Sequence, residues 1–265
     1  MKTVRLCALL GASTVLVSGA LSISACGGPR PSENPKNSEP IPSSTAAASP
    51  IDPNAGEIVG SVVFHGPDPD VEVPLTADPH CRELHGGPID SGTVVADAQG
   101  RLAHAFVYVS AGLSGPPPSP PSAAVELDQS GCSYTPRVLG LRVGQTLAIK
   151  NSDDTIHNVH GIPSANPEFN QGTPVRGMSI EKVFSKPDVM VRMKCDVHPW
   201  MSAWVGVLDH PYFAVSAADG SFRIAGLPAG TYTLSLWHES LGTRQQTVTV
   251  EPRGSSRADF DLTTP

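Results

Sequence analysis

Aromatic residues, helical periodicity and long apolar runs are all scarce in this sequence. Aromatic side chains make up 5% of the 265 residues, whereas the chain holds 25 glycines and 27 prolines. No stretch repeats its apolar residues at the helical spacing, which excludes a helical bundle. After the targeting segment at the start of the chain, no apolar run is long enough to span a bilayer as a helix. These absences leave an all-β chain, rich in turns, as the expected fold class.

Catalytic motifs and basic surface are missing as well. No Ser-His-Asp arrangement, pair of catalytic carboxylates or phosphate-binding loop stands out, so we do not expect an enzyme. Of the 18 basic residues, Lys2 and Arg5 belong to the targeting segment, and the remaining 16 stand against 25 acidic residues. The resulting net charge of −9 repels a phosphate backbone, so nucleic acid is not an expected partner.

The first 26 residues form the targeting segment. Lys2 and Arg5 give it a charged start, residues 6–17 form a short apolar run, and Ile23–Cys26 closes it. This ending resembles the bacterial lipobox, in which the cysteine is acylated and becomes the mature N-terminus. The alternative is an ordinary signal peptide with an incidental cysteine. Acylation of Cys26 would anchor the exported protein to a membrane.

Residues 27–55 contain Pro, Ser, Asn, Ala and Gly with almost no large apolar side chains. Such a segment cannot bury a core, so we expect a disordered tether that holds the folded part away from the lipid. The expected location is the periplasm or the cell surface. Because Gly27 and Gly28 provide no acidic retention-type residue after Cys26, the outer membrane is favoured where the cell has one.

Alternating apolar residues predict strands in the rest of the chain. Ile58, Val62 and Phe64 alternate in one stretch, and Val107 and Val109 alternate in another. Further strands are expected around residues 125–127, 138–143, 147–150 and 180–184.

The stretch from Cys195 to Met201 carries ligands for a soft metal. Apolar residues alternate up to Cys195, which aims its sulfur at the protein interior. His198 follows, and Pro199 stops the strand so that a tight turn can bring the sulfur, imidazole and thioether round one point. His157, far upstream, would supply a second imidazole. A thiolate, two imidazoles and a long axial thioether are the ligands of an electron-transfer copper site.

Other interpretations of these residues stay open. Zinc accepts two histidines and one cysteine equally well. Without a metal, Cys195 would be a buried thiol beside a structural histidine, and Met201 would be a core residue. His160 offers a further imidazole three residues after His157, and spacing alone does not choose between the two.

The Cys-x-x-His-x-x-Met spacing, with a proline after the histidine, resembles the blue-copper cupredoxins, a plastocyanin-like family, and within them the amicyanins. Asn151–Asn158 is similar to the cupredoxin segment that carries the first histidine ligand. The resemblance covers residues 122–208 and implies a Greek-key barrel with one type 1 copper ion. The implied metal ligands are His157, Cys195, His198 and Met201.

The same resemblance implies roles for two neighbours of His157 and for the whole protein. Asn158 would hydrogen-bond between the two ligand segments and hold them together. His160 would lie outside the ligand set, as a supporting or surface imidazole. The implied function is the transfer of single electrons to and from a redox partner protein.

A second motif lies near the C-terminus. Asp219–Leu234 follows the pattern Asp-Gly-x-Phe-x-Ile…Leu-Pro-x-Gly-x-Tyr-x-Leu. It resembles the carboxypeptidase regulatory-like or transthyretin-like module, an immunoglobulin-like sandwich that is similar to carbohydrate-binding folds. Too little chain follows residue 208 for a whole sandwich. We therefore expect residues 56–115 to supply its first strands, residues 209–265 the remainder, and residues 122–208 to be inserted between them.

Cysteine usage agrees with export. Three of the five cysteines have expected places in the targeting segment, the lipid anchor and the metal site. Cys81 and Cys132 remain, and in an oxidising compartment they are expected to form a disulfide. The alternative is a second metal site that includes His80 or His85.

Two other functions compete with electron transfer. The protein would be a carbohydrate-binding or adhesion lipoprotein if its aromatic side chains lined a groove, and Trp200 and Trp204 are the candidates. Copper storage or delivery would favour clusters of Met and His, whereas the chain has only five Met. The fold by itself does not decide between these functions.

Overall fold

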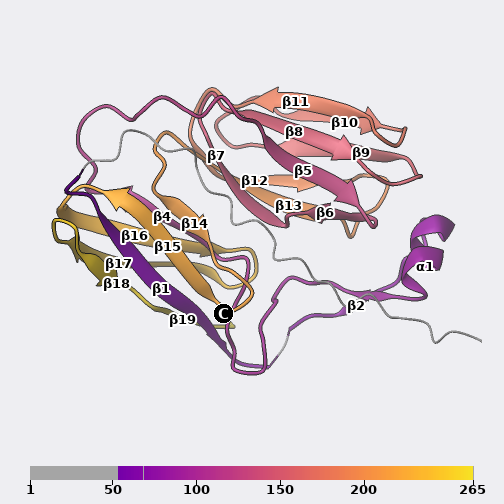
Figure 1. Cartoon of the computed structure of the whole chain (residues 1–265). Coiled ribbons are helices and arrows are strands. Elements are labelled where there is room, and N and C mark those ends of the chain that lie inside the picture. Colours follow the sequence, from indigo (N-terminus) through magenta and orange to yellow (C-terminus); the bar gives the residue numbers. More distant parts are fainter. Residues whose placement is uncertain (1–52, 68, 265) are drawn as a thin grey trace, which may run out of the picture. The chain divides into compact units, whose positions relative to one another are not determined.

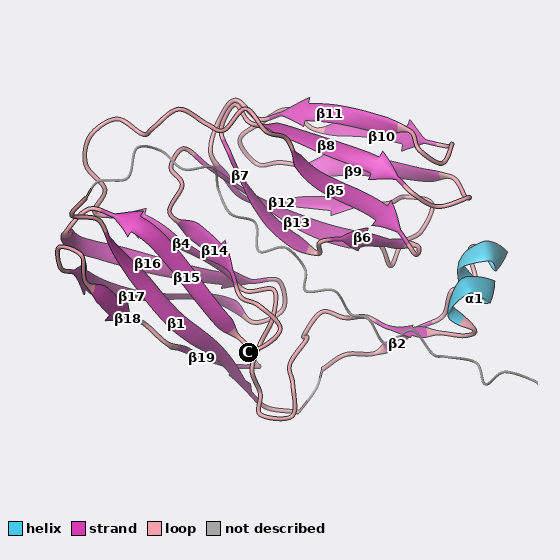
Figure 2. Cartoon of the chain, in the orientation of Figure 1, coloured by secondary structure: helices cyan, strands magenta, loops and turns pink. Residues whose placement is uncertain are grey.

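The computed structural model describes residues 53–67 and 69–264. The targeting segment, the proposed acylation site Cys26 and all but the last three residues of the expected tether lie outside these ranges. Within them, almost every regular element is a strand (Figure 2). The predicted all-β fold class is confirmed. In the described part of the chain, no helix has both the length and the apolar character that a membrane crossing requires.

Strands from both ends of the described chain pair to form one sandwich, named here the flanking sandwich. Its strands are β1 (Gly56–His65), β4 (Phe106–Ala111), β14 (Phe213–Val215), β15 (Ser221–Leu227), β16 (Gly230–His238), β17 (Gly242–Val250), β18 (Ser255–Arg257) and β19 (Phe260–Thr263). In one sheet β1 lies between β15 and the short strands β18 and β19 (Figure 1). The other sheet has the order β14-β4-β16-β17. Segments from the start and the end of the described chain therefore share each sheet.

The strands between β4 and β14 in sequence form a second sandwich, named here the central sandwich. They are β5 (Val125–Ser130), β6 (Ser133–Thr135), β7 (Val138–Arg142), β8 (Thr146–Asn151), β9 (His157–Ile162), β10 (Phe169–Thr173), β11 (Ser179–Val183), β12 (Asp188–Lys194) and β13 (Ser202–Leu208). One sheet has the order β10-β9-β12-β13-β7 and the other β11-β8-β5-β6. The pairs β5–β8 and β7–β13 are parallel and the other pairs are antiparallel. An apolar core lies between the two sheets.

Burial follows the alternation that predicted the strands. Ile58, Val62 and Phe64 on β1, and Val107 and Val109 on β4, are each no more than 6% exposed. Burying an apolar side chain of this size typically contributes about 1.5–3 kcal/mol. The flanking sandwich is therefore held by the same residues whose period of two indicated strands.

Phe106 packs where the two sandwiches meet. It is fully buried, and its ring centroid lies 5.6 Å from that of Phe213 on β14. Gly140 on β7 and Gly206 on β13 are register partners in the central sandwich. A Cβ atom on Gly206 would overlap the ring of Phe106, and one on Gly140 would overlap Phe213. The two glycines therefore let aromatic rings of the flanking sandwich lie directly on the backbone of the central one.

One short helix interrupts the strands. The helix α1 (Pro79–His85) lies between the two-residue strands β2 (Glu72–Val73) and β3 (Ile89–Asp90). Asp78 caps its start, and its Oδ1 accepts a hydrogen bond of 2.7 Å from the His80 N–H. The sequence did not predict this helix, because a single turn or two is too short to show a periodic pattern.

Cys81 on α1 forms a disulfide with Cys132, which lies in the turn between β5 and β6. The predicted pairing is confirmed. The alternative of a second metal site at these thiols is wrong, because both sulfurs are taken up in the bond.

The buried histidine at the end of β16 makes stability depend on pH. Burial lowers the pKa of His238 to about 4, whereas an exposed histidine in the unfolded chain has a pKa of about 6.5. Between pH 6.5 and pH 4 the histidine is therefore protonated in the unfolded chain but not in the folded protein. The free energy of unfolding falls as the pH drops through this range, by on the order of 3 kcal/mol. We expect His238→Gln to lose less stability over this range, as measured by urea unfolding at pH 7 and pH 4. Equal losses in the two proteins would contradict this origin of the acid sensitivity.

Candidate metal centre

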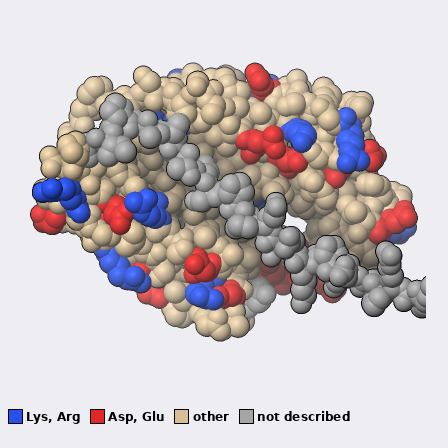
Figure 3. Space-filling model, viewed as in Figure 1, with Lys and Arg blue, Asp and Glu red and all other residues tan. Residues whose placement is uncertain are grey.

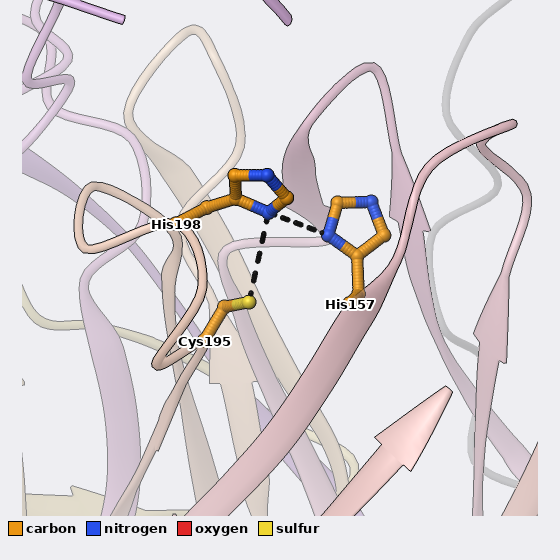
Figure 4. A group of neighbouring side chains, drawn as sticks. All are labelled: His157, Cys195 and His198. Atoms are coloured by element: carbon orange, nitrogen blue, oxygen red, sulfur yellow. Dashed lines mark hydrogen bonds between the residues drawn. The ribbon is translucent and has the colours of Figure 1, made fainter. Parts of the chain in front are cut away.

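Three of the four predicted metal ligands converge at one end of the central sandwich. His157 begins β9, and Cys195 and His198 follow the end of β12; their side chains point toward one another (Figure 4). The two Nδ1 atoms are 2.9 Å apart, and Cys195 Sγ lies 3.7 Å from His198 Nδ1. All three residues are at most 1% exposed, and their donor atoms lie within 4.8 Å of one another. Together they form a possible site for one metal ion.

The local sequence explains why the thiol and the second imidazole lie together. Val191 and Met193 are buried on β12, and Cys195 continues the same alternation inward. The turn that follows closes on itself, because Met201 N–H donates to the His198 carbonyl at 2.9 Å and Cys195 N–H donates to the Met201 carbonyl at 3.2 Å. Met201 is buried in the same apolar cluster as Cys195. The tight turn thus returns the chain to the sulfur within seven residues, Cys195 to Met201.

Asn158 connects the two ligand-bearing segments. Its Oδ1 accepts a hydrogen bond of 2.7 Å from the Asp196 N–H and lies 3.3 Å from Cys195 Sγ. Asn158 directly follows His157 on β9, and Asp196 directly follows Cys195. One side chain therefore fixes the distance between the first histidine and the cysteine.

Each imidazole is oriented by a carboxylate on its far side. His157 Nε2 lies 2.9 Å from Asp153 Oδ2, and His198 Nε2 lies 3.0 Å from Asp78 Oδ2. An ionised carboxylate only accepts hydrogen bonds, so each Nε2–H donates to its carboxylate and each Nδ1 is left facing the shared centre, where its lone pair would bind a metal ion. Sequence reasoning missed both carboxylates. Only Asp153 had a signal, because it lies four residues before His157 in the segment that resembles the cupredoxins.

The thiol is prepared to act as a thiolate. Burial raises the pKa of Cys195, but its hydrogen bonds with His157 and His198 lower it by more and leave it at about 6. At neutral pH the sulfur is therefore mostly ionised. The thiolate is the form of cysteine that binds metals.

His160 lies away from this centre. On β9 the side chains of His157 and Val159 are buried, and those of Asn158 and His160 lie on the other face. His160 Nε2 lies 2.7 Å from Glu168 Oε1 and its Nδ1 lies 3.1 Å from Asp196 Oδ2. The hydrogen bond to Glu168 raises the pKa of His160, and that to Asp196 adds to the effect. The structure thus separates the two histidines that spacing could not distinguish.

The donor set shows which ions fit. One thiolate and two imidazoles suit copper or zinc, whereas hard ions such as Mg²⁺ and Ca²⁺ prefer oxygen ligands. The second group of close donors in the described residues, Asp78, Cys81 and His198, shares a histidine with the first and uses a disulfide sulfur. The fold and the donor set together define an all-β protein with a possible site for one copper or zinc ion.

Comparison with known proteins finds both predicted resemblances. Residues 201–263 match the family model of the carboxypeptidase regulatory-like domain, a range that contains β14 to β19 of the flanking sandwich and also β13 of the central one. A search of curated proteins finds no match.

Among solved structures the chain is similar to several copper proteins. A purple cupredoxin from Nitrosopumilus maritimus is 26% identical over 31% of this chain and 97% of its own, with a TM-score of 0.27. The Cu(I) form of an amicyanin variant is 21% identical over 38% of this chain and 97% of its own, with a TM-score of 0.29. A copper-containing nitrite reductase from Thermus scotoductus SA-01 is 25% identical over 38% of this chain, with a TM-score of 0.29. The chain spans only 25% of that reductase.

Proposed function

We propose that the protein is a type 1 copper protein that carries single electrons between redox partners. The convergence of the Cys195 thiolate with His157 and His198 is the observation that supports this proposal. Cys195 would supply the strong thiolate bond, the two histidines the nitrogen ligands, and Met201 the weak axial contact. A copper ion bound there would supply one-electron redox chemistry. We further propose that Cys26 anchors the protein to a membrane that faces the periplasm or the cell surface.

The residues around the ligands favour electron transfer over catalysis. Both imidazoles and the thiol are buried, and each imidazole is held on its far side by a carboxylate. Ligands held in this way would move little when a bound copper ion gains or loses one electron. Small movements of the ligands favour rapid electron exchange. Burial also excludes water from the centre. These features suit a carrier that leaves its partners chemically unchanged.

Contacts of the two candidate aromatic residues do not favour a carbohydrate-binding surface. Trp200 Nε1 donates to the Cys132 carbonyl at 3.0 Å. Trp204 Nε1 donates to Glu239 at 3.1 Å, and the ring of Trp204 lies 4.9 Å from that of Trp237. Both half-buried indoles thus use their N–H groups within the protein, in the central sandwich and where it meets the flanking one.

Surface charge is consistent with a protein partner. On the face drawn in Figure 3, Lys and Arg side chains lie in small groups beside Asp and Glu, and most of the surface between them is uncharged. Such a mixed surface on an acidic chain does not favour nucleic acid. We propose that the partner is another redox protein.

Two histidine variants test this assignment. We expect His157→Ala to lose the intense visible absorption of the copper-loaded protein and to weaken copper binding by more than the roughly 10–100-fold typical of an outer-sphere partner. His160→Ala should keep the absorption, because its imidazole is bound to Glu168 and Asp196 instead. Optical titration with Cu(II) measures both effects. Loss of colour in His160→Ala with retention in His157→Ala would contradict the ligand assignment.

A further inference from the structure

Asp78 uses its two carboxylate oxygens for two different tasks. Oδ1 caps α1 by accepting the hydrogen bond from His80 N–H. Oδ2 faces the metal centre, where it accepts a hydrogen bond of 2.8 Å from Thr155 Oγ1 and lies 3.0 Å from His198 Nε2. Only 13% of the Asp78 side chain is exposed, and the His198 side chain that it covers is not exposed at all. A residue 120 positions before His198 thus closes that side of the site.

The segment that carries Asp78 is tied covalently to the central sandwich. Cys81, three residues further on, is joined to Cys132 by the disulfide. His85, at the other end of α1, lies with its Nε2 2.9 Å from the Gly131 carbonyl. The sulfurs pack with Leu75, Ile89 and Trp200 in a small apolar cluster. These contacts hold α1, and with it Asp78, against the turn between β5 and β6.

The same turn also holds the carboxylate of the other imidazole. Gly131 N–H donates to Asp153 Oδ1 at 2.7 Å, and Cys132 N–H donates to Asp153 Oδ2 at 2.8 Å. Both turn residues have positive φ, 63° for Gly131 and 54° for Cys132, and so both N–H groups reach one carboxylate. Asp153 Oδ2 in turn lies 2.9 Å from His157 Nε2. The turn therefore positions Asp153 by hydrogen bonds and Asp78 through the disulfide.

We infer that Asp78 is a positioning residue for the metal centre, held in place by the Cys81–Cys132 disulfide. It fixes the His198 ring with Nε2–H directed at Asp78 and Nδ1 facing Cys195. Its negative charge makes the imidazole a stronger donor, which stabilises the more highly charged Cu(II) state and lowers the reduction potential. This effect on copper rests on the proposed function, whereas the effect on the proton position does not.

The variant Asp78→Asn tests the inference. Asparagine has the same shape and is an equally good helix cap, so α1 is preserved while the charge facing His198 is removed. In the copper-loaded full-length protein we expect a higher reduction potential and Cu(II) affinity about 10–100-fold weaker, with the visible absorption retained. The matched control is Asp154→Asn, which removes the same charge from an exposed carboxylate paired with Arg176 and should leave both values unchanged.

A second measurement does not depend on copper. Nitrogen-15 NMR of the metal-free protein reports which ring nitrogen of His198 carries the proton. We expect Nε2 in the wild type and in Asp154→Asn, and a mixture of the two tautomers in Asp78→Asn. The variant that replaces both Cys81 and Cys132 by serine should shift toward that mixture, because the tie that places Asp78 is lost.

The outcomes separate the inference from the proposed function. If Asp78→Asn matches the Asp154→Asn control in potential, affinity and tautomer, Asp78 does not act through His198. If the wild type takes up no copper while the tautomer change is still seen, the electron-transfer function fails and the positioning role of Asp78 stands. If the serine variant keeps the wild-type tautomer, the disulfide is not what holds Asp78.

Discussion

Replacing Cys195 by alanine should abolish the intense visible absorption of the copper-loaded protein. That absorption arises from charge transfer between the thiolate and Cu(II), so it cannot survive the loss of the sulfur. The buried site would keep two imidazoles, and any copper they bind would be only weakly coloured. Absorption spectra of the wild type and the variant, taken at equal copper loading, measure the effect.

Met201→Leu is the matched control for this prediction. It removes the other sulfur in the turn but leaves the thiolate in place, so the colour should remain. The reduction potential should rise, because a weak axial donor stabilises Cu(II). If Cys195→Ala binds copper with an unchanged spectrum, the thiolate is not a ligand and the assignment fails.

Phe106→Ala should destabilise the protein by about 3–5 kcal/mol, the usual cost of removing a fully buried aromatic ring. The ring is in contact with Phe213 and lies over Gly140 and Gly206 of the central sandwich. Its loss would leave a cavity where the two sandwiches meet. Urea unfolding followed by tryptophan fluorescence measures the change, since Trp204 and Trp237 lie in the same cluster.

A double-mutant cycle tests whether the contact between Phe106 and Gly206 is the cause. Gly206→Ala alone should destabilise the protein, because its Cβ would overlap the Phe106 ring. In the Phe106→Ala background the methyl group added by Gly206→Ala enters the space left by the ring. The loss of stability caused by Gly206→Ala should then shrink or vanish. The two substitutions together should then cost less than the sum of their separate effects. Additive costs would show that the two residues do not pack directly.

Local sequence patterns predicted most of the fold. On β1 the buried residues Ile58, Val62 and Phe64 share the face that the alternation predicted, and on β4 Val107 and Val109 do the same. Phe106 is also buried but lies on the opposite face of β4, so the alternation did not reveal it. β10 has no such pattern, because Asn170 and Gln171 are exposed and only its last residue is buried. It is a strand because it pairs with β9. Backbone pairing does not require a particular residue pattern, so a polar edge strand cannot be recognised from its sequence. The bounds of the inserted block, residues 122–208, stay a prediction.

The metal site was predictable only where its residues are close in sequence. Cys195, His198 and Met201 lie in one turn, and so their spacing in the sequence was enough to indicate a metal site. The spacing of His157 and His160 indicates that they face opposite sides of a strand. It does not say which of the two faces the core. The contact between Asp78 and His198 has no sequence signal. The disulfide beside Asp78 was predicted, but the contact depends on how α1 packs around it, which is a property of the folded chain.

The visible absorption spectrum of the full-length protein during titration with Cu(II) tests the central claim most directly. We predict an intense band that grows until one copper is bound per chain, that ascorbate bleaches and that air or another oxidant restores. The zinc-loaded protein should be colourless. Copper binding without the intense band, or retention of zinc alone when both metals are offered, would contradict the assignment of a type 1 copper protein.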